Sequence, residues 1–269
     1  MTVIMDGKKI SAELQDGLKR KVSEAAEDIR VVTLGFHETP SFLYKRRKKL
    51  ADKLGIVYDY HLISPADSHE IMTAFSQNQK ISGLVLDGEI PDSLDEFSLR
   101  LAMAPDKDME GFHPINQGKL LLGEKGLVPP TPLAAIALLK AYDIPINGKH
   151  VVVFGRGKVV GKPLIPLLLK ENATVTVLHS RSKEPEKIAS QADIVISAVG
   201  KPRFINGDYI KEGAVVVDIG MSTDESGNLS GDVDSDAVMG KAGYLSLVKG
   251  GISPLGLTMF MKQIVDQYK

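Results

Sequence analysis

A glycine turn between an apolar strand and an apolar helix is the most chemically informative segment of this chain. Residues 151–155 are VVVFG, and the turn continues through Arg156 and Gly157 to Gly161. Backbone N–H groups at the start of such a helix carry partial positive charge and can approach a pyrophosphate closely. The spacing therefore predicts a dinucleotide site, with a turn that serves packing alone as the alternative.

The end of the next strand indicates which dinucleotide is bound. A strand is predicted at 174–178, and it ends in His179, Ser180, Arg181 and Ser182. An NAD site usually carries an acidic residue at this point for the ribose hydroxyl groups. Arginine and serine, together with Arg156 in the turn, suit a 2′-phosphate instead. The pattern predicts NADP as the cofactor, whereas the alternative treats both arginines as ordinary surface charges.

Two later strand ends extend this candidate cofactor site. Gly200 and Pro202 follow the strand predicted at 193–198, and Asp218 and Gly220 lie at the end of the strand predicted at 214–219. Ligands of open parallel sheets bind at the carboxyl ends of the strands, although tight turns are also common there. The expected cofactor residues are Gly155, Arg156, Gly157, Val160, Gly161, Ser180, Arg181, Gly200, Pro202, Asp218 and Gly220.

A basic segment at 41–49, SFLYKRRKK, offers a second kind of chemistry. On a helix that starts at Ser41, the side chains of Tyr44 and Lys48 share one face at i and i+4. A lysine in a partly buried cleft can act as a general base when its pKa is lowered. A tyrosine one turn earlier provides a ring for stacking and a hydroxyl group. The alternative is a solvated basic helix face.

Two loops complete the set of candidate segments. The loop 105–114 contains Asp106, Asp108 and Glu110, but its carboxylates match no metal-ligand spacing, so no metal is predicted. The segment from Gly250 to Pro254 precedes the last predicted helix. It is either a plain N-terminal turn or a backbone edge for a planar ligand.

Helices and strands must alternate along the chain to position these residues. Hydrophobic periodicity predicts helices at 11–29, 42–54, 68–77, 133–142 and 255–268, the fourth with Thr131 as its N-cap and Pro132 at its first position. The strands are predicted at 31–35, 56–63, 83–86, 151–154, 174–178, 193–198, 214–219 and 244–247. Such alternation implies parallel sheets with right-handed crossovers.

The fold class is therefore α/β, with two α/β lobes that each contain a parallel sheet. Residues 1–120 are expected to form a catalytic lobe, to which the C-terminal helix 255–269 would return. Residues 121–254 are expected to form a Rossmann-type dinucleotide-binding domain. In two-lobed enzymes of this kind the substrate usually lies between the lobes.

Composition narrows the function classes. The 269 residues are 43% hydrophobic and 25% charged, with a net charge of −1, which gives no reason to expect nucleic acid or an anionic membrane as a partner. The absence of cysteine excludes disulfides, thiolate catalysis and cysteine-based zinc sites. The first residues lack a signal-peptide core and no apolar run approaches 18 residues, so a cytoplasmic location is expected.

Taken in order, these segments resemble the bifunctional methylenetetrahydrofolate dehydrogenase/cyclohydrolase family over essentially the whole chain. The family pattern S-x-x-Y-x-x-x-K is met by Ser41, Tyr44 and Lys48. The patterns K-D-V-D-G-F, P-x-T-P and G-R-S-x-x-V-G-x-P are met, with substitutions, by residues 107–112, 129–132 and 155–163. No single pattern is specific, but their joint order is.

The resemblance implies an activity and a role for each candidate. It implies NADP-dependent oxidation of 5,10-methylenetetrahydrofolate, followed by hydrolysis of the methenyl product to 10-formyltetrahydrofolate. Lys48 would be the catalytic lysine, Tyr44 would stack near the folate, and Arg156 and Ser180 would face NADP. The implied substrate-binding residues are Ser41, Tyr44, Asp108, Glu110, Gly250, Gly251 and Pro254. The family also implies a homodimer that forms through the nucleotide domain.

The chain departs from the family mainly on the folate side. Asp87 replaces a glutamine that lies beside the catalytic lysine, and Glu110 replaces an aspartate. Gly157 replaces a serine, residues 247–254 are LVKGGISP in place of P-V-P-G-G-V-G-P, and Gly256 replaces a threonine. These changes keep two alternatives open: a divergent paralogue that acts on another pterin or cyclic substrate, and a non-catalytic NADP-binding protein.

Asp87 bears directly on the hydrolytic step, and we include it among the catalytic candidates. A carboxylate within about 4–6 Å of a lysine favours the charged form of the amine, whereas a proton acceptor must be neutral. We therefore predict that cyclohydrolase activity is weakened while dehydrogenase activity survives.

Overall fold

The computed structural model describes residues 1–224 and 226–268, which divide into two compact units. One unit comprises Met1–Ser11 and Thr131–Gly256, and the other comprises Ala12–Pro130 together with the C-terminal segment from Leu257. The division falls within helices α1 (Gly7–Ser23), α6 (Pro130–Ala141) and α10 (Ile252–Gln267). We refer to the units as the nucleotide unit and the N-terminal unit, in that order.

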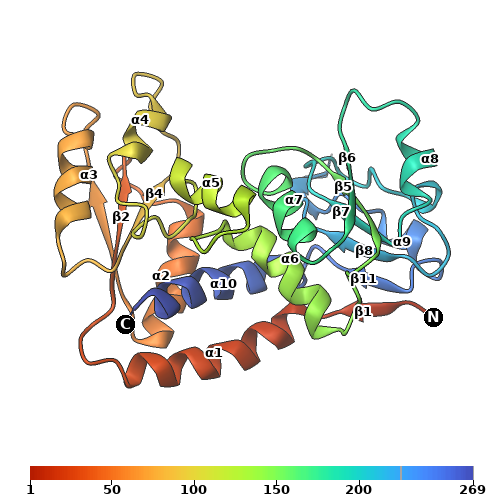
Figure 1. The fold of residues 1–269 in the computed structure, drawn as a ribbon, viewed down its shortest axis with the longest axis horizontal. Helices are drawn as coiled ribbons and strands as arrows, with labels where there is room; N and C mark the ends of the chain where they lie inside the picture. The colour runs from red at the N-terminus through yellow and green to blue at the C-terminus, as the bar shows by residue number, and fades with distance from the viewer. Residues whose placement is uncertain (225, 269) are drawn as a thin grey trace. The chain divides into compact units, whose positions relative to one another are not determined.

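The N-terminal unit is built on a three-stranded parallel sheet in the order β3-β2-β4. Its elements are β2 (Arg30–Gly35), α2 (Phe42–Leu54), β3 (Val57–Leu62), α3 (Ser68–Gln77), β4 (Gly83–Asp87), α4 (Glu96–Leu101) and α5 (Pro114–Leu122). Alternate strand residues face opposite sides, so each face has its own core. Val31, Tyr58 and Val85 pack with side chains of α2 and α10, whereas Val32, Leu34 and Leu84 pack with α3 and α4. Figure 1 shows α2 and α3 on opposite sides of this sheet.

The nucleotide unit contains a six-stranded parallel sheet in the order β1-β11-β8-β7-β5-β6. The strands are β1 (Val3–Met5), β5 (His150–Phe154), β6 (Thr174–Leu178), β7 (Ile194–Ser197), β8 (Val215–Asp218) and β11 (Tyr244–Ser246). The connecting helices are α7 (Gly161–Lys170), α8 (Pro185–Ala189) and α9 (Ser235–Val238), and a short antiparallel ribbon pairs β9 (Ser222–Thr223) with β10 (Leu229–Ser230). Buried aliphatic residues fill β5, β7 and β8, as expected for a sheet covered on both faces.

Several element boundaries differ from the sequence-based prediction, and the causes are local. Helix α6 begins at Pro130, so the predicted N-cap at Thr131 is wrong and Pro132 lies inside the first turn. Prolines fit there because the first N–H groups of a helix need no intrahelical acceptor. Strand β1 was not predicted, and its pairing with β11 places the first eleven residues in the nucleotide unit.

Candidate functional site

Ser41 is the N-cap of helix α2, which begins at Phe42 as predicted, and this residue ties the helix to the end of β4. The Ser41 Oγ accepts a hydrogen bond from the backbone N–H of Tyr44 at 3.0 Å, which caps the helix. The backbone N–H of Ser41 donates to Asp87 Oδ2 at 2.8 Å, and its hydroxyl group donates to Asp87 Oδ1. Asp87 is only 6% exposed, so its carboxylate fixes the start of α2 at the carboxyl edge of the sheet.

Tyr44 lies in a cluster of tyrosine rings. Its ring centroid is 5.5 Å from that of Tyr58 and 5.1 Å from that of Tyr60, and its hydroxyl group donates to the Tyr58 carbonyl at 3.4 Å. Burial raises the pKa of Tyr44, and the nearby carboxylates of Asp59, Asp52 and Asp87 raise it further. The hydroxyl group therefore stays protonated at neutral pH and can donate a hydrogen bond.

Lys48 follows Tyr44 by one helical turn and pairs with a carboxylate on its own helix. Its ammonium group forms an ion pair with Asp52, and its side chain is 41% exposed. Asp87 is bound by Ser41 instead, and no ion pair joins Lys48 to Asp87 in the described part of the chain. The carboxylate that contacts Lys48 is therefore Asp52, which the sequence analysis did not identify as a candidate.

The acidic loop contains two buried carboxylates with different partners. Asp108 accepts hydrogen bonds from the backbone N–H of His113 at 2.6 Å and from the Asn116 amide at 3.2 Å. Burial raises the pKa of Asp108, because these two donors compensate only part of the lost hydration. His113 in turn caps α5 through its Nδ1 atom. Asp108 therefore shapes the loop that carries Glu110.

Glu110 forms a buried ion pair with Arg47, a residue that sequence reasoning missed. The Arg47 Nη2 atom lies 2.9 Å from Glu110 Oε1, and both side chains are almost fully buried. The guanidinium group also lies over the Phe260 ring, 4.1 Å from its centroid. Arg47 belonged to a run of five basic residues, so its type alone gave no signal; its position one turn after Tyr44 could have given one.

The glycine turn before α10 packs against the start of α1 within the nucleotide unit. The Lys8 backbone N–H donates to the Gly250 carbonyl at 2.9 Å, and the Ser11 hydroxyl group donates to the Pro254 carbonyl at 3.3 Å. Gly250 has a φ angle of +91°, and a Cβ atom on Gly251 would lie 2.5 Å from the Leu247 carbonyl oxygen. The two predicted glycines are thus needed by the backbone itself.

A cavity of about 510 Å³ opens at the carboxyl ends of β5, β6 and β7. Of the predicted cofactor residues, it brings together Gly155, Arg156, Gly157 and Ser180. Gly155 has a φ angle of +105°, and a Cβ atom there would lie 2.4 Å from the Ala198 carbonyl oxygen. Only glycine fits, and the turn leaves open space beside Gly157. The volume is within the usual range for small-molecule sites.

The remaining predicted cofactor residues do not line this cavity. Val160 and Gly161 lie at the start of α7, and Arg181, Gly200 and Pro202 lie in the loops that follow the strands. Asp218 lines a separate cavity of about 330 Å³, and Gly220 follows it by two residues. Sequence reasoning missed the aromatic wall formed by Phe204 and Tyr209, whose rings lie 5.9 and 5.7 Å from that of Phe154. No periodic pattern marks these two residues, because they lie in a loop and a 3-10 turn.

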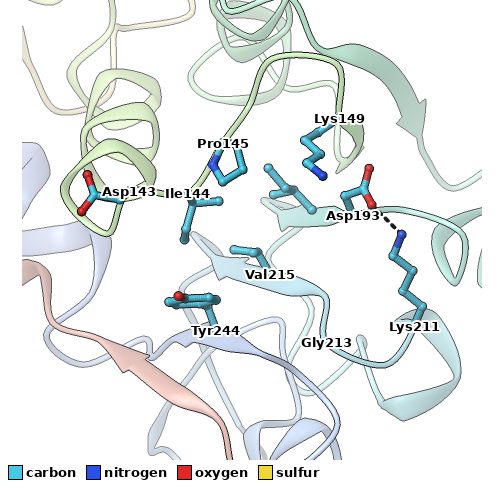
Figure 2. Close-up of a pocket in the computed structure, with 10 residues that line it drawn as sticks. Asp143, Ile144, Pro145, Lys149, Asp193, Lys211, Gly213, Val215 and Tyr244 are labelled. Carbon is cyan, nitrogen blue, oxygen red and sulfur yellow. Dashed lines mark hydrogen bonds and ion pairs between the residues drawn. The ribbon is translucent and has the colours of Figure 1, made fainter.

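A smaller cavity of about 210 Å³ lies at the opposite edge of the same sheet, where β5, β7, β8 and β11 begin. Figure 2 shows that Lys211 points toward Asp193, and these side chains form an ion pair at 2.6 Å. Open parallel sheets bind ligands at their carboxyl edge, and small-molecule pockets usually exceed about 300 Å³. This cavity is therefore not a candidate cofactor site.

Within residues 1–224 and 226–268, no three or more histidine, aspartate or glutamate side chains gather in a way that could hold a metal ion. No helix in that part of the chain has the length and apolar character required to span a membrane.

Comparison with known proteins places this geometry in a family. Residues 129–269 match the family model described as tetrahydrofolate dehydrogenase/cyclohydrolase, NAD(P)-binding domain. The Bifunctional protein FolD of Staphylococcus aureus is 40% identical over 267 residues, which cover 96% of this chain and 93% of that protein.

Solved structures agree over the whole length. The FolD methylenetetrahydrofolate dehydrogenase/cyclohydrolase of Campylobacter jejuni superimposes with a TM-score of 0.93 at 32% identity, covering 100% of this chain and 99% of that one. The Trypanosoma brucei methylenetetrahydrofolate dehydrogenase-cyclohydrolase, solved with NADP and an inhibitor, gives a TM-score of 0.89 at 29% identity, with coverage of 99% and 97%. The chain belongs to the tetrahydrofolate dehydrogenase/cyclohydrolase family.

Proposed function

We propose that this chain oxidises 5,10-methylenetetrahydrofolate to 5,10-methenyltetrahydrofolate with NADP⁺ and then hydrolyses the product to 10-formyltetrahydrofolate. The observation that carries the proposal is the joint presence of two features in one family member. The first is the glycine turn with Arg156 at the end of β5. The second is the group of Ser41, Tyr44 and Lys48 at the start of α2. A pure binding protein has no evident need for the second feature.

The nucleotide unit fits NADP. Gly157 leaves room for a pyrophosphate beside the backbone, and Arg156 and Ser180 line the same cavity as donors for a 2′-phosphate. When bound, NADP⁺ supplies the hydride acceptor for the one-carbon bridge of the folate. The protein aligns the two reactants and excludes water from the transfer.

The N-terminal unit supplies the folate-binding and hydrolytic groups. Tyr44 offers a ring face for the folate, and Glu110, fixed by Arg47, offers a carboxylate oxygen to N–H groups of the pterin. Lys48 accepts the proton when water attacks the methenyl carbon. The amine must leave its ion pair with Asp52 before it can accept this proton, so we expect a slow cyclohydrolase step.

We also propose that the protein is a homodimer formed through the nucleotide unit. The support is the family resemblance rather than any feature of a single chain. Light scattering after size-exclusion chromatography would detect the dimer, and a single-chain mass near 29.1 kDa would contradict it.

The two activities can be measured separately by the absorbance of methenyltetrahydrofolate. We expect it to form from methylenetetrahydrofolate with NADP⁺, more slowly with NAD⁺, and to disappear during hydrolysis. Lys48→Met should lower the hydrolysis rate about 100-fold or more, because general acid–base catalysis contributes on this scale. Lys49→Met removes a neighbouring exposed charge and is the matched control.

Two results would contradict this proposal. Tight NADP⁺ binding without turnover of methylenetetrahydrofolate would favour another pterin or cyclic substrate. Equal hydrolysis rates in Lys48→Met and wild type would remove Lys48 from the mechanism while leaving the dehydrogenase assignment in place.

A further inference from the structure

A fully buried carboxylate in the nucleotide unit holds the segment that follows β7. Asp232 is 0% exposed. Its Oδ2 atom accepts hydrogen bonds from the Ser197 hydroxyl group at 2.8 Å and from the Val199 N–H at 2.7 Å. Its Oδ1 atom accepts from the Lys201 N–H at 2.8 Å. One side chain therefore holds residues 197–201 at three points, of which two are backbone N–H groups and one is the Ser197 hydroxyl group.

The segment that Asp232 holds is a wall of the cofactor cavity. Ala198, Val199 and Lys201 line the cavity together with Gly155 and Arg156. The Ala198 carbonyl is also the group that excludes a side chain at Gly155. A shift of this segment would change both the wall of the cavity and the packing of Ala198 against Gly155.

Asp232 is itself held rigidly by a second buried carboxylate. Its backbone N–H donates to Asp218 Oδ1, and the Val233 N–H donates to Asp218 Oδ2, both at 3.1 Å. A Cβ atom on Gly220 or Gly231 would lie 1.9 Å from the carboxyl groups of Asp232 and Asp218, respectively. The ends of β7 and β8 and the chain after β10 thus interlock around the two side chains.

The contacts require a carboxylate at this position. Among the residues that the structure describes, no basic side chain forms an ion pair with Asp232, so hydrogen-bond donors alone compensate its charge. An asparagine has one acceptor oxygen, and its NH₂ group would face either the Lys201 N–H or the Ser197 and Val199 donors. The change keeps the shape of the side chain and breaks one side of the contact.

We infer that Asp232 is a positioning residue for the dehydrogenase reaction: it sets the backbone of residues 198–201 in the geometry that binds NADP. The inference rests on the proposed function. It assigns Asp232 to the NADP-dependent step alone, because cyclohydrolase chemistry uses no dinucleotide.

The test compares Asp232→Asn with Asp236→Asn, which removes an exposed carboxylate from the same unit. Calorimetry measures NADP⁺ affinity, and both activities are measured on one preparation. We expect Asp232→Asn to weaken NADP⁺ binding and to lower dehydrogenase kcat/KM about 10- to 100-fold, the range that follows from small misplacement of a binding group. Cyclohydrolase activity and the control variant should stay within about twofold of wild type.

Equal loss of both activities, or unchanged NADP⁺ affinity in a folded variant, would overturn the inference. If Asp232→Asn fails to fold, Ser197→Ala removes one of the three donors and keeps the carboxylate. We then expect NADP⁺ binding to weaken about threefold to tenfold, and no change would overturn the inference. A wild type that binds NADP⁺ without oxidising folate would refute the proposed function, yet the affinity measurement would still decide the role of Asp232.

Discussion

At the scale of single residues, the proposed folate binding rests on the buried pair formed by Glu110 and Arg47. Their ion pair is buried, and the Nε atom of Arg47 has no hydrogen-bond partner among the described residues. Burial opposes the charge on Arg47, but Glu110 and Tyr58 together more than offset this effect and raise the pKa of Arg47. A buried carboxylate without such a partner would be strongly destabilised, so the longer glutamate and the arginine depend on each other.

We predict that Arg47→Lys raises KM for methylenetetrahydrofolate about tenfold and leaves KM for NADP⁺ unchanged, because lysine keeps the charge but loses the planar fork and the contact with Phe260. Steady-state kinetics with each substrate varied in turn would measure both values. Arg46→Lys on the same helix is the control. A parallel rise in both KM values would indicate general damage and contradict the role assigned to Glu110.

At the scale of elements, the start of α2 joins helix capping to the position of the catalytic candidates. We predict that Ser41→Ala costs about 1 kcal/mol or more in the free energy of unfolding, because it removes the cap and one donor to the buried Asp87. It should also lower folate-dependent activity while NADP⁺ binding persists.

Asp95→Ala is the matched control, since Asp95 caps α4 through hydrogen bonds from Phe97 and Ser98. Urea unfolding should show a similar loss of stability, whereas the kinetics of this variant should match wild type. If both variants lose activity equally, the cap at Ser41 contributes to stability alone.

Elements with a strong hydrophobic pattern could be predicted from the sequence almost residue by residue. Helices α2 and α3 and strand β6 match their predicted bounds, because each has clear periodicity between turn residues. Strand β1 was missed since three residues carry no period, and its partner β11 lies about 240 residues away. Helices α4 and α5 were missed because Asp95 and His113 cap short, mixed segments.

The candidate site could be predicted only where residue type and spacing carry information. Tyr44, Lys48 and the glycine turn follow fixed patterns, and the structure places them at a helix start and a strand end. The partners of Lys48 and Asp87 could not be predicted, because which carboxylate meets which donor depends on side-chain packing. The same holds for Asp232, whose three contacts span more than thirty residues.

At the scale of the whole molecule, the buried Asp218 and Asp232 couple folding to pH. Burial raises the pKa of Asp218 from 3.8 to about 7, and the charge of Asp232 also raises it. Between about pH 4 and pH 7 the folded protein therefore holds a proton on Asp218 that the unfolded chain releases. The unfolded state binds fewer protons in this range, so the free energy of unfolding must fall as pH rises, and above about pH 7 this contribution levels off.

We predict that wild type loses a few kcal/mol of stability from this group between about pH 5 and pH 8, and that Asp218→Asn loses less because asparagine does not titrate. Urea unfolding at four pH values measures, for each protein, how steeply the free energy of unfolding changes with pH.

The slope with pH is compared, and not the absolute stability at one pH, because the substitution itself removes a contact. Asparagine has one acceptor oxygen, so it can accept from only one of the two backbone N–H groups of residues 232 and 233. Asp208→Asn removes an exposed carboxylate in the same unit and should keep the wild-type slope. Parallel slopes in wild type and Asp218→Asn would mean that Asp218 is ionised throughout this range. The three hydrogen-bond donors to Asp232 would then be sufficient to stabilise the neighbouring negative charges of Asp218 and Asp232.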